Sequence, residues 1–137
     1  MVAANQNLTT VLERNLHVTP RGLDWVMLSV PIFIDTSVHP LAADSYKILT
    51  IDAQTFVIGG YQLVQTVELA ADTISVGDIA AANGKLAATA VNALGMTAWT
   101  AAAEYYPAAD EIQITPNAAI TVCKFWEIVL LQYLSTT

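Results

Sequence analysis

The residues that could carry metal or nucleophilic chemistry are few and far apart in this chain. It has two histidines, His17 and His39, and one cysteine, Cys123, which lies inside an apolar run. No spacing of Cys, His and Asp resembles a zinc site, and a single cysteine cannot form an intramolecular disulfide. Gly59-Gly60 lacks the Lys-Ser/Thr pair that completes a phosphate-binding loop and is interpreted as a turn. We therefore expect a buried thiol, no metal and no cofactor.

Carboxylates offer a second kind of chemistry. Asp72, Asp78, Asp110 and Glu111 each stand beside an expected turn, where aspartate is favoured by hydrogen bonds to the backbone. Two of them facing each other across a cleft could hydrolyse a glycoside, and loop oxygens could bind calcium. The sequence has no D-x-D-x-D pattern and no G-x-S-x-G elbow. Turn formation is the favoured interpretation, and no catalytic residue is predicted.

Aromatic side chains could form a binding platform. Such rings stack on sugars, but they also dominate protein cores and interfaces. Trp25 and Trp126 lie in apolar runs and are expected in the core or at an interface. Trp99, Tyr105 and Tyr106 lie outside such runs and are the better candidates for an exposed binding patch.

The elements that must position these residues are short strands separated by turns. Runs of strand-forming residues cover 23–34, 46–51, 55–58, 61–69, 73–76 and 111–115, with turn signals such as Gly59-Gly60 and Gly77-Asp78 between them. Residues 79–94 are rich in alanine and could form a helix or an irregular crossing segment. Many short strands at this spacing predict an all-β fold, an antiparallel β-sandwich that is jelly-roll-like.

The segment 120–134 is the strongest expected strand, and it is apolar on both faces. Continuous apolarity predicts that both faces are covered. Alternation groups Phe125 with Val129, Leu131 and Glu127, whose charge is costly to bury. The opposite group carries Lys124 and Gln132, and its two polar residues indicate the less buried face. That face is predicted to contact another subunit through Val122, Trp126, Ile128, Leu130 and Leu134.

Length and composition fit one domain preceded by an arm. The chain has 137 residues, of which 55% are hydrophobic and only 12% charged, whereas about 25% charged residues is usual. So few charges leave apolar surface, which favours self-association or docking. Residues 1–22 are mostly polar, with a turn signal at Thr19-Pro20-Arg21-Gly22, and are predicted to be an N-terminal arm. Residues 23–137 are predicted to form the sandwich domain.

The charge pattern bears on possible partners. The formal net charge is −7, and the five basic residues are scattered along the chain, so we expect no nucleic-acid binding. No run approaches the roughly 20 apolar residues of a spanning helix, and the first ten residues lack the features of a signal peptide. We expect no membrane partner and a soluble product that is initially cytoplasmic.

Residues 60–134 resemble small bacteriophage virion proteins. The shared pattern is a strand (61–69), a short strand ending in Val-Gly-Asp (Ile74-Ser75-Val76-Gly77-Asp78), and an Ala-rich stretch (79–103). An Asp-Glu-Ile strand (110–115) and a final apolar strand (122–134) follow. The resemblance implies a capsid decoration (cement) or head-fibre protein, usually a trimeric β-sandwich, located in the virion. Its partners would be copies of itself and the major capsid protein or another virion protein, and the arm would contact a neighbour or the capsid floor.

Two further functions remain open at this point. A carbohydrate-binding module is the main alternative, and it requires Trp99, Tyr105 and Tyr106 to be exposed beside a groove. An enzyme is the third, and the sequence offers it no visible catalytic group. The favoured hypothesis is a non-enzymatic virion structural protein that acts by adhesion.

Overall fold

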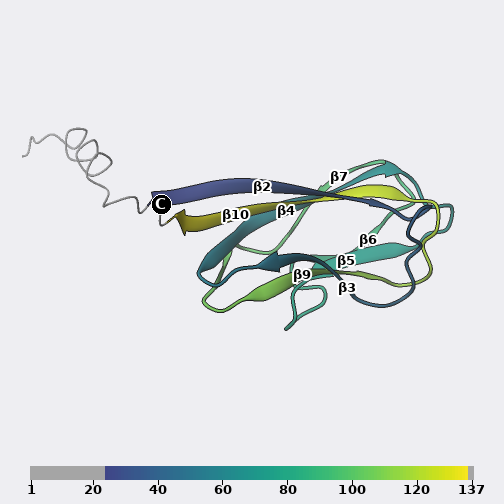
Figure 1. The fold of residues 1–137 in the computed structure, drawn as a ribbon. Coiled ribbons are helices and arrows are strands. Elements are labelled where there is room, and N and C mark those ends of the chain that lie inside the picture. The colour runs from purple at the N-terminus through teal and green to yellow at the C-terminus, as the bar shows by residue number, and fades with distance from the viewer. Residues whose placement is uncertain (1–23, 136–137) are drawn as a thin grey trace, which may run out of the picture.

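The computed structural model describes residues 24–135 as nine strands in two facing sheets (Figure 1). No residue in this range is helical, so the described chain contains no helix that is long and apolar enough to cross a membrane. The strands are β2 (Asp24–Asp35), β3 (Tyr46–Ile51), β4 (Thr55–Thr66), β5 (Thr73–Gly77), β6 (Leu86–Ala90), β7 (Gly95–Ala98), β8 (Glu104–Tyr106), β9 (Asp110–Pro116) and β10 (Lys124–Ser135).

Each sheet is antiparallel and contains a strand, β10 or β9, that pairs with a neighbour on both sides. The first, here named the β10 sheet, has the order β2-β10-β4-β7, with β8 pairing beside β7 along β4. The second, the β9 sheet, has the order β3-β9-β5-β6. Figure 1 shows the two sheets stacked as layers, with β2, β10 and β4 in one and β3, β9 and β5 in the other.

The chain crosses repeatedly between the two layers. It passes from β2 to β3 in the other sheet, returns in β4, and crosses again to β5. The last two strands, β9 and β10, insert beside early strands, so that β10 lies between β2 and β4. The all-β, antiparallel sandwich expected from the sequence is therefore confirmed.

One predicted strand boundary is wrong, and the structure decides between the alternatives left open for the Ala-rich stretch. The glycine pair Gly59-Gly60 does not end a strand, because β4 continues through it and both glycines stay in register with β10, opposite Leu130 and Val129. The Ala-rich stretch 79–94 contains no helix; it is a loop followed by strand β6. Asp78 explains the loop, because its Oδ1 accepts hydrogen bonds from the N–H groups of Ala80 and Ala81 at 3.1 and 3.0 Å.

The predicted arm, residues 1–22, lies outside the described residues. The sandwich they precede has its own core, which the two sheets enclose between them. The buried apolar side chains come from both sheets and from the loops at their ends: Leu41, Ile51, Val57, Val64, Ile74, Val76, Leu86, Val91, Trp99, Tyr106, Ile112, Ile114, Ile120, Cys123, Phe125, Val129 and Leu131.

Candidate functional site

The outward face of the β10 sheet is the most unusual surface of the described chain. Along β10, Phe125, Val129 and Leu131 are buried, whereas Trp126 and Ile128 between them are only partly covered. Successive strand residues point to opposite faces, so Trp126 and Ile128 point away from the core. The alternation predicted for this strand is therefore confirmed, and the Trp126 side is the less buried one.

The neighbouring strands continue the same apolar surface. The outermost strand, β2, exposes Trp25, Met27 and Phe33, whose side chains are 51%, 65% and 45% accessible. Tyr61 on β4 and Met96 on β7 add to it at 36% and 61%. The surface, here named the apolar face, consists of Trp25, Met27, Pro31, Phe33, Phe56, Ile58, Tyr61, Leu63, Met96, Tyr105, Trp126, Ile128, Leu130 and Leu134.

Aromatic pairs run across the strands of this face. Trp25 on β2 meets Phe56 on β4 edge to face, with 5.8 Å between ring centroids, and Phe56 meets Tyr105 on β8 at 4.8 Å. Phe33 packs on Trp126, its partner in the register of β2 and β10, at 4.9 Å. Such pairs add about 0.5–1.5 kcal/mol each beyond area burial. They hold the exposed rings in fixed positions, which reduces the entropy lost when a partner covers them.

The charges of the sandwich lie away from the centre of the apolar face. Lys124 and Asp35 stand at one end of it, with 4.0 Å between Nζ and Oδ2. On the opposite side of the molecule, the outward residues of the β9 sheet are polar: Lys47 is exposed, and Gln113 donates to the Glu111 carboxylate at 2.9 Å. The two sheets therefore present different chemistry to the surroundings.

The size of the apolar face is comparable with that of an interface. Three of its strands, β2, β4 and β10, have 12 residues each. At about 3.3 Å per residue and about 4.8 Å between strands they cover roughly 550 Å², and β7 and β8 extend that area. A standard protein interface buries about 800 Å² on each partner, whereas apolar patches larger than a few hundred Å² are rare on monomers.

The predicted aromatic patch is wrong for two of its three members. Trp99 and Tyr106 are buried, at 7% and 4% accessibility, and only Tyr105 is exposed, at 44%. Each buried ring has a polar group that needed a partner inside the protein: the Trp99 N–H donates to Glu127, and the Tyr106 hydroxyl donates to Asp78. The three rings form no common platform, and Tyr105 instead joins the apolar face beside Phe56.

The predicted interface residues lie as follows. Trp126, Ile128 and Leu130 point outward from the middle of β10, and Leu134 lies near its end at 40% accessibility. Val122 precedes the strand; it is exposed at 37%, and its N–H donates to Glu68 at 3.1 Å. Sequence reasoning missed the contribution of β2, because Trp25, Met27 and Phe33 stand in a run too continuously apolar to show which side faces out. Ser29 and Pro31 alternate in step with these three residues, and they were the available sign that this side of β2 faces outward.

A buried acid lies directly beneath the apolar face. Glu127 has no accessible surface, and its Oε1 accepts the Trp99 indole N–H at 3.2 Å. Burial raises the pKa of Glu127 to about 8, although the hydrogen bond from Trp99 opposes the rise. Gln62, opposite Glu127 in the register of β4 and β10, is also buried. The Gln62 amide atoms and Glu127 Oε2 have no hydrogen-bond partner among the described residues.

A second polar cluster holds the loop between β5 and β6. Tyr106 Oη donates to Asp78 Oδ2 at 2.6 Å, and Lys85 Nζ donates to Glu104 Oε1 at 2.7 Å. The Lys85 ammonium also lies 5.0 Å from the centre of the Tyr106 ring. Burial and the neighbouring Asp78 raise the pKa of Tyr106, so the phenol stays protonated. These groups satisfy one another, which gives the cluster a structural role.

Among residues 24–135, no three His, Cys, Asp or Glu side chains are grouped so that they could hold a metal ion. Cys123 is fully buried, and burial raises the pKa of its thiol to about 11. The expectation of a buried thiol is thus confirmed.

The fold is shared with chains of bacteriophage capsids. A chain in the acidic stable capsid structure of Helicobacter pylori bacteriophage KHP30 matches with a TM-score of 0.58 and 15% identity, over 84% of this chain and 94% of that one. Chains in the cyanophage Pam1 capsid and in the capsid of Ralstonia phage GP4 both match with a TM-score of 0.59. The Pam1 chain is 13% identical over 86% of this chain and 89% of its own, and the GP4 chain 14% over 79% and 84%.

These identities are low, so the likeness is one of fold. No protein-family model matches the sequence, and a search of curated proteins finds no similar sequence. The architecture expected from the resemblance to small virion proteins is nevertheless the one the chain adopts.

Proposed function

We propose that this chain is a non-enzymatic structural protein of a bacteriophage virion, a decoration or cement protein that binds the capsid lattice and self-associates, as a trimer. The observation that carries the proposal is the apolar face of the β10 sheet on a sandwich whose fold recurs in three phage capsid structures. Its partners are then further copies of itself and the major capsid protein or another virion protein.

The mechanism is adhesion by burial of the apolar face. Removing apolar surface from water contributes about 25 cal/mol per Å², and exposed rings such as Trp25 and Phe33 supply large contact areas. The centre of the face carries no charge that a partner would have to desolvate. Little of the free energy gained by burying the apolar surface is therefore lost. Contacts repeated over a lattice add avidity beyond the strength of any one of them.

Charge supports the choice of this face over the others. The chain carries a formal net charge of −7, so two copies repel each other through most of their surfaces. The centre of the apolar face adds nothing to that repulsion, and the polar outer side of the β9 sheet, with Glu111 and Lys47, remains in solvent.

Self-association is tested by sedimentation at micromolar concentration, where a mass near three times 14.7 kDa is expected. Phe33→Ser on the apolar face is expected to lower the mass, whereas the control Lys47→Ser on the β9 sheet is expected to leave it unchanged. A 14.7 kDa species at every concentration would contradict self-association. Mass spectrometry of purified phage particles tests the virion location, and absence from the particles would contradict it.

A further inference from the structure

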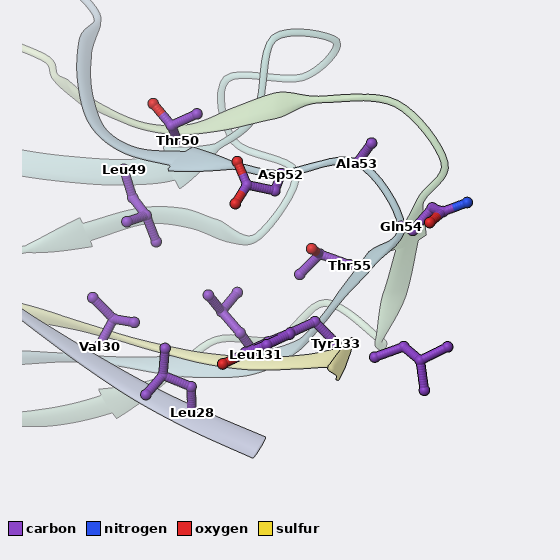
Figure 2. A pocket seen from close by; sticks show the side chains of 11 residues that line it. Leu28, Val30, Leu49, Thr50, Asp52, Ala53, Gln54, Thr55, Leu131 and Tyr133 are labelled. Carbon is purple, nitrogen blue, oxygen red and sulfur yellow. The ribbon is translucent and has the colours of Figure 1, made fainter. Parts of the chain in front are cut away.

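A cavity opens between the two sheets at the end of the sandwich that carries the turn from β3 to β4. Its volume is about 520 Å³, and Leu28, Val30, Leu49 and Leu131 line its apolar part. Figure 2 shows Leu49 on one side of the space facing Leu28, Val30 and Leu131 on the other. Here the two layers of the sandwich separate, and the core side chains do not fill the gap.

The lining chemistry fits an apolar guest with a basic group at its edge. Besides the apolar side chains, Thr50, Gln54 and Thr55 are among the lining residues, and Asp52 is the one carboxylate among them. An apolar void of about 150 Å³ holds one small aromatic molecule, so this cavity has room for several aliphatic side chains. The apolar side chains that line the cavity lack van der Waals contacts on that side, and a guest would supply them.

The chain itself brings a candidate guest to the mouth of the cavity. β2 begins at Asp24, opposite Ser135 at the end of β10, and Leu28 of the same strand lines the cavity. In Figure 1 the start of β2 and the end of β10 lie together at one end of the sandwich. The 23 residues that precede β2 therefore join the described structure beside this opening.

The sequence of that leading segment matches the lining. Leu8, Val11, Leu12 and Leu16 recur at helical spacing, which groups them on one side. Thr19-Pro20-Arg21-Gly22 follows them and has the composition of a turn, so it can reverse the chain just before β2. Both arginines of the protein, Arg14 and Arg21, lie in this segment and complement the carboxylate of Asp52.

From this juxtaposition we infer that residues 8–18 fold back and dock their apolar side in the cavity of their own sandwich. The link from residue 18 to β2 is short, so the guest stands at a high effective concentration that a second copy does not match at micromolar protein. The docked segment closes the open end of the core and leaves the apolar face free for the partners proposed above.

The test is a spin label on the full-length chain. His17→Cys places a single reactive thiol on the side of the segment opposite its leucines, because the native Cys123 is fully buried. In a sample whose Leu and Val methyl groups are isotopically labelled, the nitroxide is expected to broaden the methyl signals of Val30, Leu49 and Leu131. The signal of Val64, near the other end of β4, serves as an internal reference. Mixing spin-labelled, isotope-free protein with isotope-labelled protein that lacks the spin label separates contact within one molecule from contact between two.

Broadening at Leu49 and Leu131 in the single sample, and its absence from the mixture, supports docking within the chain. Equal broadening in the mixture overturns the intramolecular assignment, since the guest then comes from another copy. Broadening confined to Leu63 and Leu130 of the apolar face, or no broadening at all, overturns the cavity as the docking site. As a second measurement, Leu12→Asp with Leu16→Asp is expected to lower the melting temperature more than the control pair Thr9→Asp with Thr10→Asp. Equal melting temperatures contradict the proposal.

Discussion

Trp99 and Glu127 are joined by a hydrogen bond of 3.2 Å inside the sandwich, and this bond links the segment after β7 to the middle of the central strand β10. Glu127 has no accessible surface, and the indole stands against Gly60 of β4. A carboxyl group that accepts one hydrogen bond in an apolar core is more stable neutral than ionised. The protonation state of Glu127 therefore affects the stability of the fold.

The stability of the protein is expected to fall as the pH rises between about 5 and about 8. The pKa of Glu127 is raised from 4.5 to about 8 by burial, so in this window the folded chain keeps a proton that the unfolded chain releases. The stability that this proton provides is fully present below the pKa of Glu127 in the unfolded chain. It is lost as the pH rises toward the pKa of Glu127 in the folded chain, at no more than about 1.4 kcal/mol per pH unit. Urea denaturation at several pH values measures the slope.

Glu127→Gln serves as the matched variant for this measurement. It keeps an oxygen that can accept the Trp99 N–H but does not ionise, so its stability is expected to change less over the same pH range. Its advantage over the native protein should grow as the pH rises. Parallel pH profiles of the two proteins would show that Glu127 does not titrate as described.

Gly60→Ala is expected to destabilise the sandwich, whereas Gly59→Ala is not. A Cβ at Gly60 would lie 2.5 Å from Trp99 Cδ2 and 2.7 Å from the Ile128 carbonyl oxygen, but one at Gly59 would meet no atom within 4 Å. Overpacking of this kind costs about 1–3 kcal/mol. The Gly59 variant should stay within about 1 kcal/mol of the native protein, in the stabilising direction. Thermal unfolding of the two variants checks the contrast, and similar losses in both would contradict it.

Trp126→Ala and Phe125→Ala are expected to act on different equilibria. Phe125 is fully buried in the core, so its loss should lower the unfolding free energy by about 3–5 kcal/mol at every protein concentration. Trp126 points outward on the apolar face, so its loss should weaken association, and its effect should depend on concentration. Melting temperatures over a hundredfold range of concentration measure both. If the Trp126 effect does not change with concentration, residue 126 is not at a subunit contact.

Tyr106→Phe is expected to cost more than Tyr105→Phe. Removing the Tyr106 hydroxyl takes a 2.6 Å donor away from Asp78 and leaves that buried carboxylate less well satisfied, at about 1–3 kcal/mol. Tyr105 is exposed, and loss of its hydroxyl should stay within about 0.5 kcal/mol. Urea midpoints of the two variants provide the comparison, and equal midpoints would argue against the role given to Tyr106.

The fold could be predicted from the sequence because strand propensity and turn residues agree along most of the chain. Residues 46–51 form strand β3 as expected, and β10 shows the predicted alternation of buried and outward residues. The continuation of β4 through Gly59-Gly60 could not be foreseen, since it depends on pairing with β10 and on the Trp99 ring beside Gly60. A glycine pair indicates a turn only where no neighbouring strand pairs with it and no side chain packs closely against it.

The candidate site was predicted in part, and the wrong placement of Trp99 and Tyr106 has one cause. Trp126, Ile128 and Leu130 could be grouped by alternation within one strand. Trp99 and Tyr106 lie in short irregular segments, where no periodicity shows the direction of a side chain. Their burial follows from Glu127 and Asp78, which are distant in sequence and close only in the folded chain. A buried Glu in an apolar strand was itself a sign that some donor must reach it.

The pairing of β2 with β10 brings the beginning and the end of the described chain together, Asp24 opposite Ser135. Forming contacts between residues so far apart in sequence requires a long loop to close, and the entropy lost in that closure raises the folding barrier. Proteins with many such contacts fold slowly. On the ribosome, neither β2 nor β4 can find its central partner until β10 has been synthesised. Until then the apolar residues of these strands remain unpaired, so newly made chains would be the most aggregation-prone form of this protein and would benefit from chaperones during synthesis.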